Sequence, residues 1–326
     1  MVARSEGAYV TWRPTRPGGD TQGMTEERSA QRWIVGIDGS GPAVDALRWA
    51  VDQARQVADS AACDVVVEAT AAFHVPAVMS LFAAKRGFGV DQIGLEATAG
   101  HDADEAIATV LADVAADAPG MSRVHTRSSV IEGQAAEVLV DAAEDATLLV
   151  VGRRGEGGLR HHVLGSVSRY CATHAATPVV VVPTDWTVRE TRSIVVGFDG
   201  SDHAAAALRW ALDVVPDGAT IRAVAAIELA PWLDQDLTVS RYPDDVREHE
   251  AAMTEAFDRI DPQHRAERDI VFHAPRQALA EASETADLVV VGTRGRGRIT
   301  AGLLGSVSTD LLHTAACPVV VATAGD

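Results

Sequence analysis

The feature that most restricts the fold of this chain is an internal repeat of long period. The stretch Ile34–Ser40 has the pattern apolar-Val-Gly-x-Asp-Gly-Ser and recurs as Val195–Ser201, and each copy is followed by Ala-Leu-Arg-Trp-Ala. A second stretch, Leu148–Gly155, recurs as Leu288–Gly295, and each copy is followed by Leu-Gly-Ser-Val-Ser. A period this long indicates duplicated whole domains and not a solenoid of short repeats.

The repeat and the chain length together predict the domain organisation. A chain of 326 residues suits two domains of ordinary size. We predict a first domain at residues 31–184 and a second at residues 190–326, joined through Pro183–Glu190. The first 30 residues, which contain several prolines and glycines, are expected to form a disordered extension, and Met24 is an alternative start.

Short apolar runs alternate with helical patterns within each copy. In the first copy the expected strands are Trp33–Ile37, Asp64–Phe73, Val124–Val130, Leu148–Val151 and Val179–Val182, and the expected helices are Ala43–Val57, Ala103–Ala115, Ala135–Glu144 and Val163–His174. Apolar strands separated by helices predict an α/β fold with a parallel sheet covered on both faces. Pro178 and Pro318 open the last strand of each copy, a position often found at a sheet edge.

Composition excludes several classes of function. Lys and Arg number 28 against 46 Asp and Glu, a formal net charge of −18, which disfavours nucleic acid and anionic membranes as partners. The single lysine, Lys85, leaves no other position for a lysine-centred mechanism. The three cysteines are far apart, so neither a disulfide framework nor a thiolate metal site is indicated. With no signal peptide and no long apolar run, we expect a cytoplasmic protein.

A glycine pattern follows the fourth expected strand of each copy. Gly152 and Gly155 precede Gly165-Ser166 with the same spacing that separates Gly292 and Gly295 from Gly305-Ser306. Glycines let the backbone approach a polyanion, and the following helix N-terminus supplies positive potential, so the pattern predicts a phosphate site. The alternative is that the serines only cap their helices. The sequence has neither a P-loop nor a G-x-G-x-x-G after the first strand, which disfavours P-loop hydrolases and Rossmann dehydrogenases.

An aspartate ends the first strand of each copy. In a doubly wound sheet of order 3-2-1-4-5, strands one and four flank the crevice where ligands lie. Asp38 and Asp199 would therefore face the glycine loops, with a ribose or a base near the carboxylate. The alternative role for Asp38 is helix capping or an Asx turn before Pro42.

These motifs, over about residues 31–326, resemble a tandem-domain member of the universal stress protein family. The resemblance implies two flavodoxin-like domains, each with a five-stranded parallel sheet, and ATP bound between the first-strand aspartate and the glycine loop. Mg²⁺ or Mn²⁺ would arrive with the phosphates and not on protein side chains. The family also implies that the last strands of two domains pair, here within one chain as a pseudo-dimer, with a further homodimer as an additional possibility.

The nucleotide site predicted from the motifs and the resemblance has the same parts in each domain. The aspartate contacts the ribose, the glycine loop holds the triphosphate, the arginines of the loop pair with phosphates, and the adenine lies against the end of the second strand. The full set is Gly36, Asp38, Ala72, Gly152, Arg153, Arg154, Gly155, Gly165, Ser166, Val167, Ser168, Gly197, Asp199, Ala226, Gly292, Thr293, Arg294, Gly295, Gly305, Ser306, Val307 and Ser308. No catalytic residue is predicted.

Two pairs of residues depart from the glycine and aspartate motifs or are unexplained by them. The first loop contains His161 and His162, which either assist or obstruct phosphate binding and which lack a spaced carboxylate for a metal site. Trp49 and Trp210, at matched positions, are expected to pack in the core and not to stack on a base.

A non-enzymatic regulator with an unknown protein partner is the leading function. The alternatives are a slow ATP hydrolase or nucleotidyl transferase, and a sink for cyclic AMP.

Overall fold

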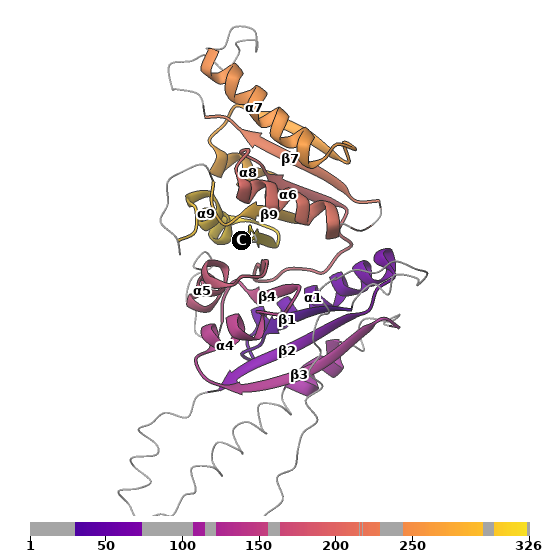
Figure 1. The fold of residues 1–326 in the computed structure, drawn as a ribbon. Coiled ribbons are helices and arrows are strands. Elements are labelled where there is room, and N and C mark those ends of the chain that lie inside the picture. Colours follow the sequence, from indigo (N-terminus) through magenta and orange to yellow (C-terminus); the bar gives the residue numbers. More distant parts are fainter. Residues whose placement is uncertain are drawn as a thin grey trace, which may run out of the picture.

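The computed structural model describes residues 30–73, 107–114, 122–155, 164–214, 216, 218–228, 244–295 and 303–324. Apart from residue 30, the expected N-terminal extension lies outside these residues, and so do His161 and His162. Figure 1 shows the chain as two similar halves stacked end to end. We refer to the half that holds β1 to β5 as domain 1 and to the half that holds β6 to β10 as domain 2.

The elements of the two domains follow each other in nearly the same order. Domain 1 contains β1 (Gln31–Gly36), α1 (Gly41–Ala61), β2 (Val65–Phe73), β3 (Val124–Glu132), α4 (Ala135–Ala142), β4 (Leu148–Gly152), α5 (Ser166–His174) and β5 (Val179–Val182), and residues 107–114 are also helical. Domain 2 contains β6 (Ser193–Gly197), α6 (Asp202–Val214), β7 (Thr220–Ala226), α7 (Asp244–Ile260), β8 (Ala266–Val271), α8 (Pro275–Ser283), β9 (Leu288–Gly292), α9 (Ser306–Thr314) and β10 (Val319–Ala322).

The first helix of domain 1 is longer than the apolar pattern predicts. It begins at Gly41 because the Ser40 hydroxyl accepts a hydrogen bond from the Ala43 N–H at 3.3 Å, and Pro42 suits the first turn. It continues to Ala61 and ends where Ala62 takes a left-handed conformation with φ of 50°. The apolar pattern located the buried stripe of this helix, whereas its ends depend on capping.

All ten strands form one sheet, in the order β3-β2-β1-β4-β5-β10-β9-β6-β7-β8. Each half has the predicted order 3-2-1-4-5, and the strands within each half are parallel. The predicted α/β class and strand order are therefore confirmed. Placing β1 beside β4, and β6 beside β9, brings the two motif-bearing strand ends of each domain to one edge of the sheet.

The two half-sheets join through their last strands. β5 and β10 pair antiparallel, and Val180 faces its counterpart Val320 across the junction. The pairing of last strands within one chain, which the family resemblance implied, is thus present. Pro178 and Pro318 directly precede the last strand of each copy as predicted, and the edge that each copy has by itself is covered by this pairing, so both strands lie at the centre of the ten-stranded sheet. Each proline stands just before the paired residues, and its carbonyl accepts a neighbouring strand's N–H at 3.0 Å.

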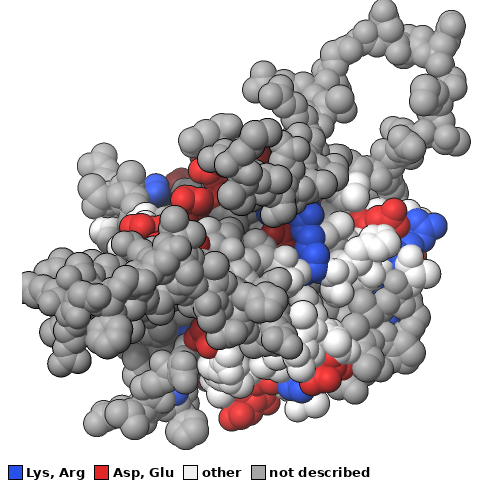
Figure 2. Space-filling view, turned by 90° about the horizontal axis from the view of Figure 1, so that it is seen from below, with Lys and Arg blue, Asp and Glu red and all other residues white. Residues whose placement is uncertain are grey.

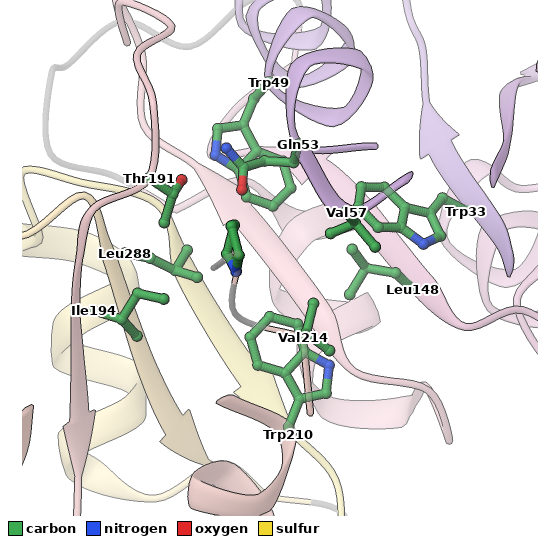
Figure 3. A pocket seen from close by; sticks show the side chains of 11 residues that line it. Trp33, Trp49, Gln53, Val57, Leu148, Thr191, Ile194, Trp210, Val214 and Leu288 are labelled. Atoms are coloured by element: carbon green, nitrogen blue, oxygen red, sulfur yellow. The ribbon is translucent and has the colours of Figure 1, made fainter. Parts of the chain in front are cut away.

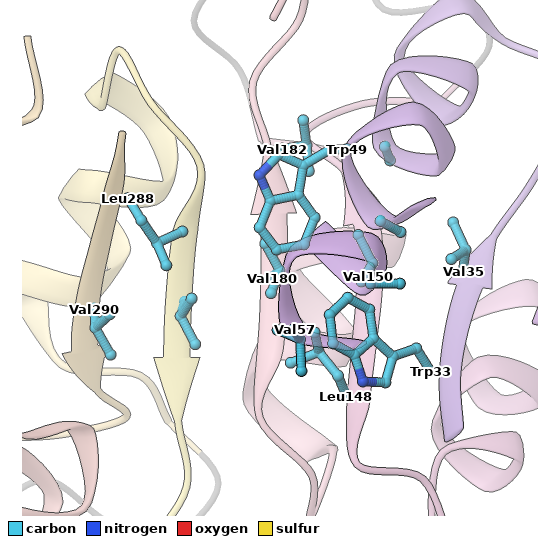
Figure 4. Close-up of a cluster of buried hydrophobic side chains, with 14 of the residues drawn as sticks. Trp33, Val35, Trp49, Val57, Leu148, Val150, Val180, Val182, Leu288 and Val290 are labelled. Carbon is cyan, nitrogen blue, oxygen red and sulfur yellow. The ribbon is translucent and has the colours of Figure 1, made fainter. Parts of the chain in front are cut away.

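Two hydrophobic layers cover the sheet, one on each face, and both run through the domain junction. One layer packs α1, residues 107–114, α6 and α7 on the sheet, and the other packs α4, α5, α8 and α9. Figure 4 shows part of the first layer, with Trp33 and Trp49 in domain 1 and Leu288 and Val290 on β9 of domain 2. Trp49 is buried and Trp210 packs against the same cluster, as predicted for core residues.

The segment between the domains is held by specific contacts. Trp186 packs against both hydrophobic layers, and the Arg189 guanidinium lies 4.6 Å from the centre of its ring. Arg189 Nε also forms an ion pair of 2.6 Å with Asp287 of domain 2. The Thr191 N–H donates to the Gln56 side chain of α1 at 3.0 Å. These contacts join the linker to both domains, so the two halves share one continuous core.

The outermost strands differ from the central ones. In β3 and β8 only the first residue is buried and the others are half-buried or exposed, whereas β5 and β10 are buried throughout. On β2, Glu68 accepts hydrogen bonds from Arg32 of β1 and Arg127 of β3, so charged hydrogen bonds link these three neighbouring strands. Figure 2 shows acidic and basic side chains next to each other on the described part of one face. Among the described helices, none combines the length and apolarity needed to cross a bilayer.

Candidate functional site

The aspartate at the end of β1 or β6 forms a tight local turn in both domains. The Asp38 Oδ1 atom accepts a hydrogen bond from the Ser40 N–H at 3.0 Å, and Asp199 Oδ1 accepts from the Ser201 N–H at the same distance. The helix cap is provided by the serine and not by the aspartate, because the hydroxyls of Ser40 and Ser201 accept from the first turn of α1 and α6. The Asx turn therefore occupies one carboxylate oxygen and fixes the direction of the other.

The second carboxylate oxygen faces the glycine loop that follows β4 or β9. A Cβ atom placed on Gly295 would lie 2.5 Å from Asp199 Oδ2, and one placed on Gly155 would come still closer to Asp38 Oδ2. Any other residue at either position would press against the carboxylate. The close approach explains these glycines, and it brings together the two motifs that the strand order predicted to be neighbours.

The first glycine of each pattern serves the packing of a helix on the sheet. A Cβ on Gly152 would lie 2.6 Å from the Pro42 carbonyl oxygen, and one on Gly292 would lie 2.6 Å from the carbonyl carbon of His203. Gly36 and Gly197 similarly leave room for Leu139 and Leu279, whose methyl groups would lie 2.7 and 2.9 Å from an added Cβ. These four predicted site residues set the distance between the sheet and its helices.

In domain 2 the predicted residues surround one cleft. The cleft holds about 830 Å³ of space that is partly open to solvent. Its lining includes Gly197, Asp199, Ala226, Gly292, Arg294, Gly295, Gly305, Ser306, Val307 and Ser308, all of them predicted from the sequence. Ala226, at the end of β7, was placed only by alignment of the copies. Thr293 is the exception among the predicted residues of this domain, and its hydroxyl lies 3.0 Å from His203 Nδ1.

Sequence reasoning missed the apolar part of this cleft. The additional lining residues are Phe198, Ala204, Val224, Pro275, Leu279 and Val291. Pro275 and Leu279 come from α8, which follows the third strand and lies across the end of β6. A signal for one of them existed, because Leu139 and Leu279 occupy equivalent positions in the two copies. Gly36 and Gly197, two residues before the aspartates, leave room for these leucines, so the matched glycine and leucine pairs were the available signal.

The helix after each glycine loop begins without a side-chain cap. The N-cap residues of α5 and α9 are Gly165 and Gly305, and neither helix has a side-chain cap hydrogen bond. Ser166 and Ser306 are the first helical residues and are exposed, so the alternative that they cap their helices is wrong. Since the first N–H groups of a helix have no partner within the helix, these ends are suited to an anion. By contrast, α1 and α6 are capped by serine.

The next serines of the pattern hold the loop itself. The Ser168 hydroxyl donates to the Arg153 carbonyl at 3.0 Å, and the Ser308 hydroxyl donates to the Gly292 carbonyl at 2.7 Å. Both serines are buried. Val167 and Val307, which precede them, pack partly against the hydrophobic layer of α5 and α9. Their side chains therefore connect the loop to the core and leave their main-chain N–H groups at the start of the helix.

The loop arginines have different surroundings in the two domains. Arg294 lines the cleft of domain 2, and its Nε atom is buried without a hydrogen-bond partner among the described residues. Arg153 is 6% exposed, and its guanidinium donates to the Ala315 carbonyl of domain 2. Burial, reinforced by the neighbouring Arg154, lowers the pKa of Arg153 to about 10. The Arg153 side chain thus lies at the domain junction and does not face the aspartate side of domain 1.

Domain 1 repeats the geometry of domain 2 around its own aspartate. Ala72 stands opposite Ile131 on β3, as Ala226 stands opposite Val271 on β8, so the two alanines lie at matching places near the ends of β2 and β7. Arg154, the counterpart of Arg294, is partly buried. The described residues of both domains contain no group of three or more His, Cys, Asp or Glu side chains placed to hold a metal ion.

A second cavity lies between the domains and has a different chemistry. Figure 3 shows Trp33 and Trp49 of domain 1 and Trp210 of domain 2 around it, with Gln53 and Thr191 among the lining residues. Its volume is about 330 Å³, less than half that of the cleft in domain 2. The lining side chains that the structure describes there carry no charge. This cavity offers nothing for a phosphate group.

The three cysteines do not provide a nucleophile at the described conformation. Cys63, Cys171 and Cys317 are free and buried. Burial raises the pKa of the Cys171 and Cys317 thiols to about 12, so both stay protonated at neutral pH. A protonated, buried thiol is unreactive.

Comparison with known proteins agrees with this architecture. The model of the universal stress protein family matches residues 30–183 and 190–323. Universal stress protein Rv2623 of Mycobacterium tuberculosis is 31% identical over 310 residues, which cover 92% of this chain and 98% of that protein. A universal stress protein of Mycolicibacterium smegmatis is 30% identical over 306 residues, which cover 91% of this chain and 99% of that protein.

A solved structure supports the fold. The crystal structure of a universal stress protein from Archaeoglobus fulgidus superposes with a TM-score of 0.63 and covers 90% of this chain and 98% of that chain. Its sequence is 17% identical, so the likeness concerns the fold alone.

Proposed function

The chain belongs to the universal stress protein family, and we propose that each of its two domains binds one ATP molecule as a regulatory ligand and not as a substrate. The observation that carries the proposal is the cleft of domain 2. There the aspartate after β6, the glycine loop after β9 and the uncapped N-terminus of α9 face one space. Nucleotide occupancy would then alter binding to a protein partner.

The nucleoside half of the ligand fits the aspartate side of the cleft. Asp199 is fixed by its Asx turn, so its carboxylate is already oriented to accept hydrogen bonds from ribose hydroxyls. Charged hydrogen bonds of this kind contribute about 1.5–3 kcal/mol. Val224, Ala226 and Leu279 provide an apolar wall next to it, which suits a flat adenine ring.

The phosphate half fits the loop side of the cleft. The first N–H groups of α9 lie at Ser306 and Val307, which line the cleft, whereas the Gly305 N–H donates to the Thr293 carbonyl at 2.8 Å. Arg294 adds a guanidinium whose Nε lacks a described partner. Because the described residues offer no cluster of metal ligands, a Mg²⁺ or Mn²⁺ ion would be held by the phosphates themselves.

Two other functions compete for the same cleft. An ATP hydrolase or nucleotidyl transferase needs a general base at the terminal phosphate, and Asp199 and Arg294 are the ionisable side chains among the described lining residues. Asp199 would be engaged with the ribose, which favours binding without turnover. A cyclic AMP sink would use the same nucleoside contacts but would gain little from Arg294 and the α9 N-terminus.

Calorimetry with Mg-ATP, competition by cyclic AMP and a phosphate-release assay separate these functions. We expect ATP binding that cyclic AMP displaces poorly, without release of phosphate over hours. Asp199→Asn, which preserves the shape and removes the charge, should weaken the binding in domain 2. A full chain that binds no ATP under conditions in which it is folded would contradict the proposal, and steady phosphate release that is lost in Asp199→Asn would favour the enzyme.

A further inference from the structure

The glycine loop of domain 1 is attached to domain 2 at both of its described ends. At the start of the loop, the Arg153 guanidinium donates a hydrogen bond to the Ala315 carbonyl. At the end of the loop, the Leu164 N–H donates to His313 Nδ1 at 3.3 Å. Both acceptors belong to the last turn of α9 or directly follow it. In Figure 1, α5 and α9 lie on the same side of the sheet, one on each side of the junction.

The chemistry of the contact favours a fixed position. The last carbonyls of a helix have no partner within the helix and carry partial negative charge, so a cation there is stabilised. Arg153 provides that cation while 6% exposed, and a buried guanidinium without its partner would be strongly unfavourable. The side chain of Arg153 is therefore bound to α9 whenever the domains are joined.

The main chain of Arg153 transmits this position to the proposed phosphate site. The Arg153 carbonyl accepts hydrogen bonds from the Gly165 N–H at 2.9 Å and from the Ser168 hydroxyl at 3.0 Å. Its N–H donates to the Val182 carbonyl of β5 at 2.7 Å. Gly165 is the N-cap of α5, so Arg153 sets where the first N–H groups of that helix lie.

The reverse attachment is missing among the described residues. Across the junction between Val180 and Val320, the pair equivalent to Arg153 and Ala315 is Thr293 and Ala175. The Thr293 hydroxyl lies 3.0 Å from His203 Nδ1 within its own domain. Thr173, the counterpart of His313, donates to the Arg169 carbonyl within α5.

We propose that the C-terminal end of α9 forms part of the domain 1 nucleotide site. Arg153 is the positioning residue, because it holds the glycine loop of domain 1 against that end of α9. The affinity of domain 1 for ATP then depends on domain 2, whereas the site of domain 2 is complete within its own domain. This inference rests on the proposed binding of ATP. It assigns to Arg153 a role through the loop and not a direct contact with phosphate.

The test uses the full chain with one site silenced at a time, by Asp199→Ala to read domain 1 and by Asp38→Ala to read domain 2. Arg153→Met should weaken Mg-ATP binding in domain 1 about tenfold, as expected for losing one charged hydrogen bond, and leave domain 2 unchanged. Arg153→Lys, which can still donate to Ala315, should restore most of the affinity. The matched variant Thr293→Val should leave domain 1 unchanged.

Amide hydrogen exchange on the ligand-free chain provides a measurement that does not depend on ATP. Arg153→Met should speed exchange at Leu164 and Gly165 and leave Leu304 and Gly305 unchanged. His313→Leu, at a partly exposed position, should speed exchange at Leu164 even if Arg153→Met fails to fold. A native chain that binds no ATP would refute the proposed function, and the exchange data would still decide the positioning. Folded Arg153→Met with native affinity in domain 1, or with native exchange at Gly165, would overturn the inference.

Discussion

The two glycine loops have the same glycine spacing, but the matched residues Arg153 and Thr293 have different surroundings. In domain 2 the loop residue Thr293 bonds within its own domain, and the cleft is built from that domain alone. In domain 1 the equivalent residue, Arg153, reaches across the junction to the end of α9. Duplication thus preserved the aspartate, the glycines and the uncapped helix, while the packing around them diverged. Equal motifs do not guarantee equal sites.

The largest expected effect concerns the junction that allows this difference. β5 is buried throughout and needs a partner strand, so residues 31–184 expressed alone should dimerise through β5. Val180→Asp would place a charge at a fully buried position of that pair and should prevent the dimer. Sedimentation would test this, since a stable, soluble monomer of the unmodified segment at micromolar concentration would contradict it.

A negative charge at the N-cap of α9 should abolish most of the ATP binding in domain 2 and leave the site of domain 1. Gly305→Glu is expected to lower ATP affinity in domain 2 by about a hundredfold or more, because its carboxylate would repel the phosphates and compete with them for the positive end of α9. The fold should survive, since a Cβ at Gly305 would have its nearest neighbour at 3.4 Å. Calorimetry should then show one remaining site. Gly305→Ala serves as the control and should bind nearly as the native chain does.

The two aspartates provide a finer comparison. Because both domains have the Asx turn and the glycine approach, the native chain should bind two ATP per chain, and Asp38→Ala and Asp199→Ala should each weaken one site by about 1.5–3 kcal/mol. Circular dichroism would verify that each variant folds. If calorimetry finds one site in the native chain, domain 2 should be the one that binds, because its cleft does not depend on its neighbour.

The smallest effect is a pH dependence shared by the two domains. Burial raises the pKa of Cys171 and Cys317 from 9.0 to about 12, so the unfolded chain releases these protons first as pH rises. Folding stability should therefore fall between about pH 9 and pH 12, by about 1 kcal/mol for each thiol at pH 10. Urea unfolding at pH 8 and pH 10 measures this. Cys171→Ala should remove half of the difference, and an unchanged pH dependence in that variant would argue against it.

The local features of this fold were predictable because they depend on neighbouring residues. The apolar strands and the glycine spacing act over a few positions, and both copies show them. The caps of α1 and α6 were not predicted, because capping there was assigned to Asp38, as its alternative role, and the structure shows Ser40 and Ser201 in that role. Leu279 and Pro275 were missed because they reach the cleft from α8, which lies outside both motifs. The prolines before β5 and β10 are typical of the edge that a single copy has by itself, and the pairing that covers this edge was implied by the family resemblance.

By itself, the sequence determined the duplication, the α/β class and the two motifs of each copy, because these follow from residue spacing that occurs twice in the chain. The strand order that brings the two motifs together was implied by the doubly wound fold class and by the family resemblance. Only the tertiary structure decided that Arg153 faces the junction and Arg294 the cleft. The physical reason is that the antiparallel pairing of β5 with β10 places the domain 1 loop beside the last turn of α9, where the long side chain of Arg153 reaches the Ala315 carbonyl.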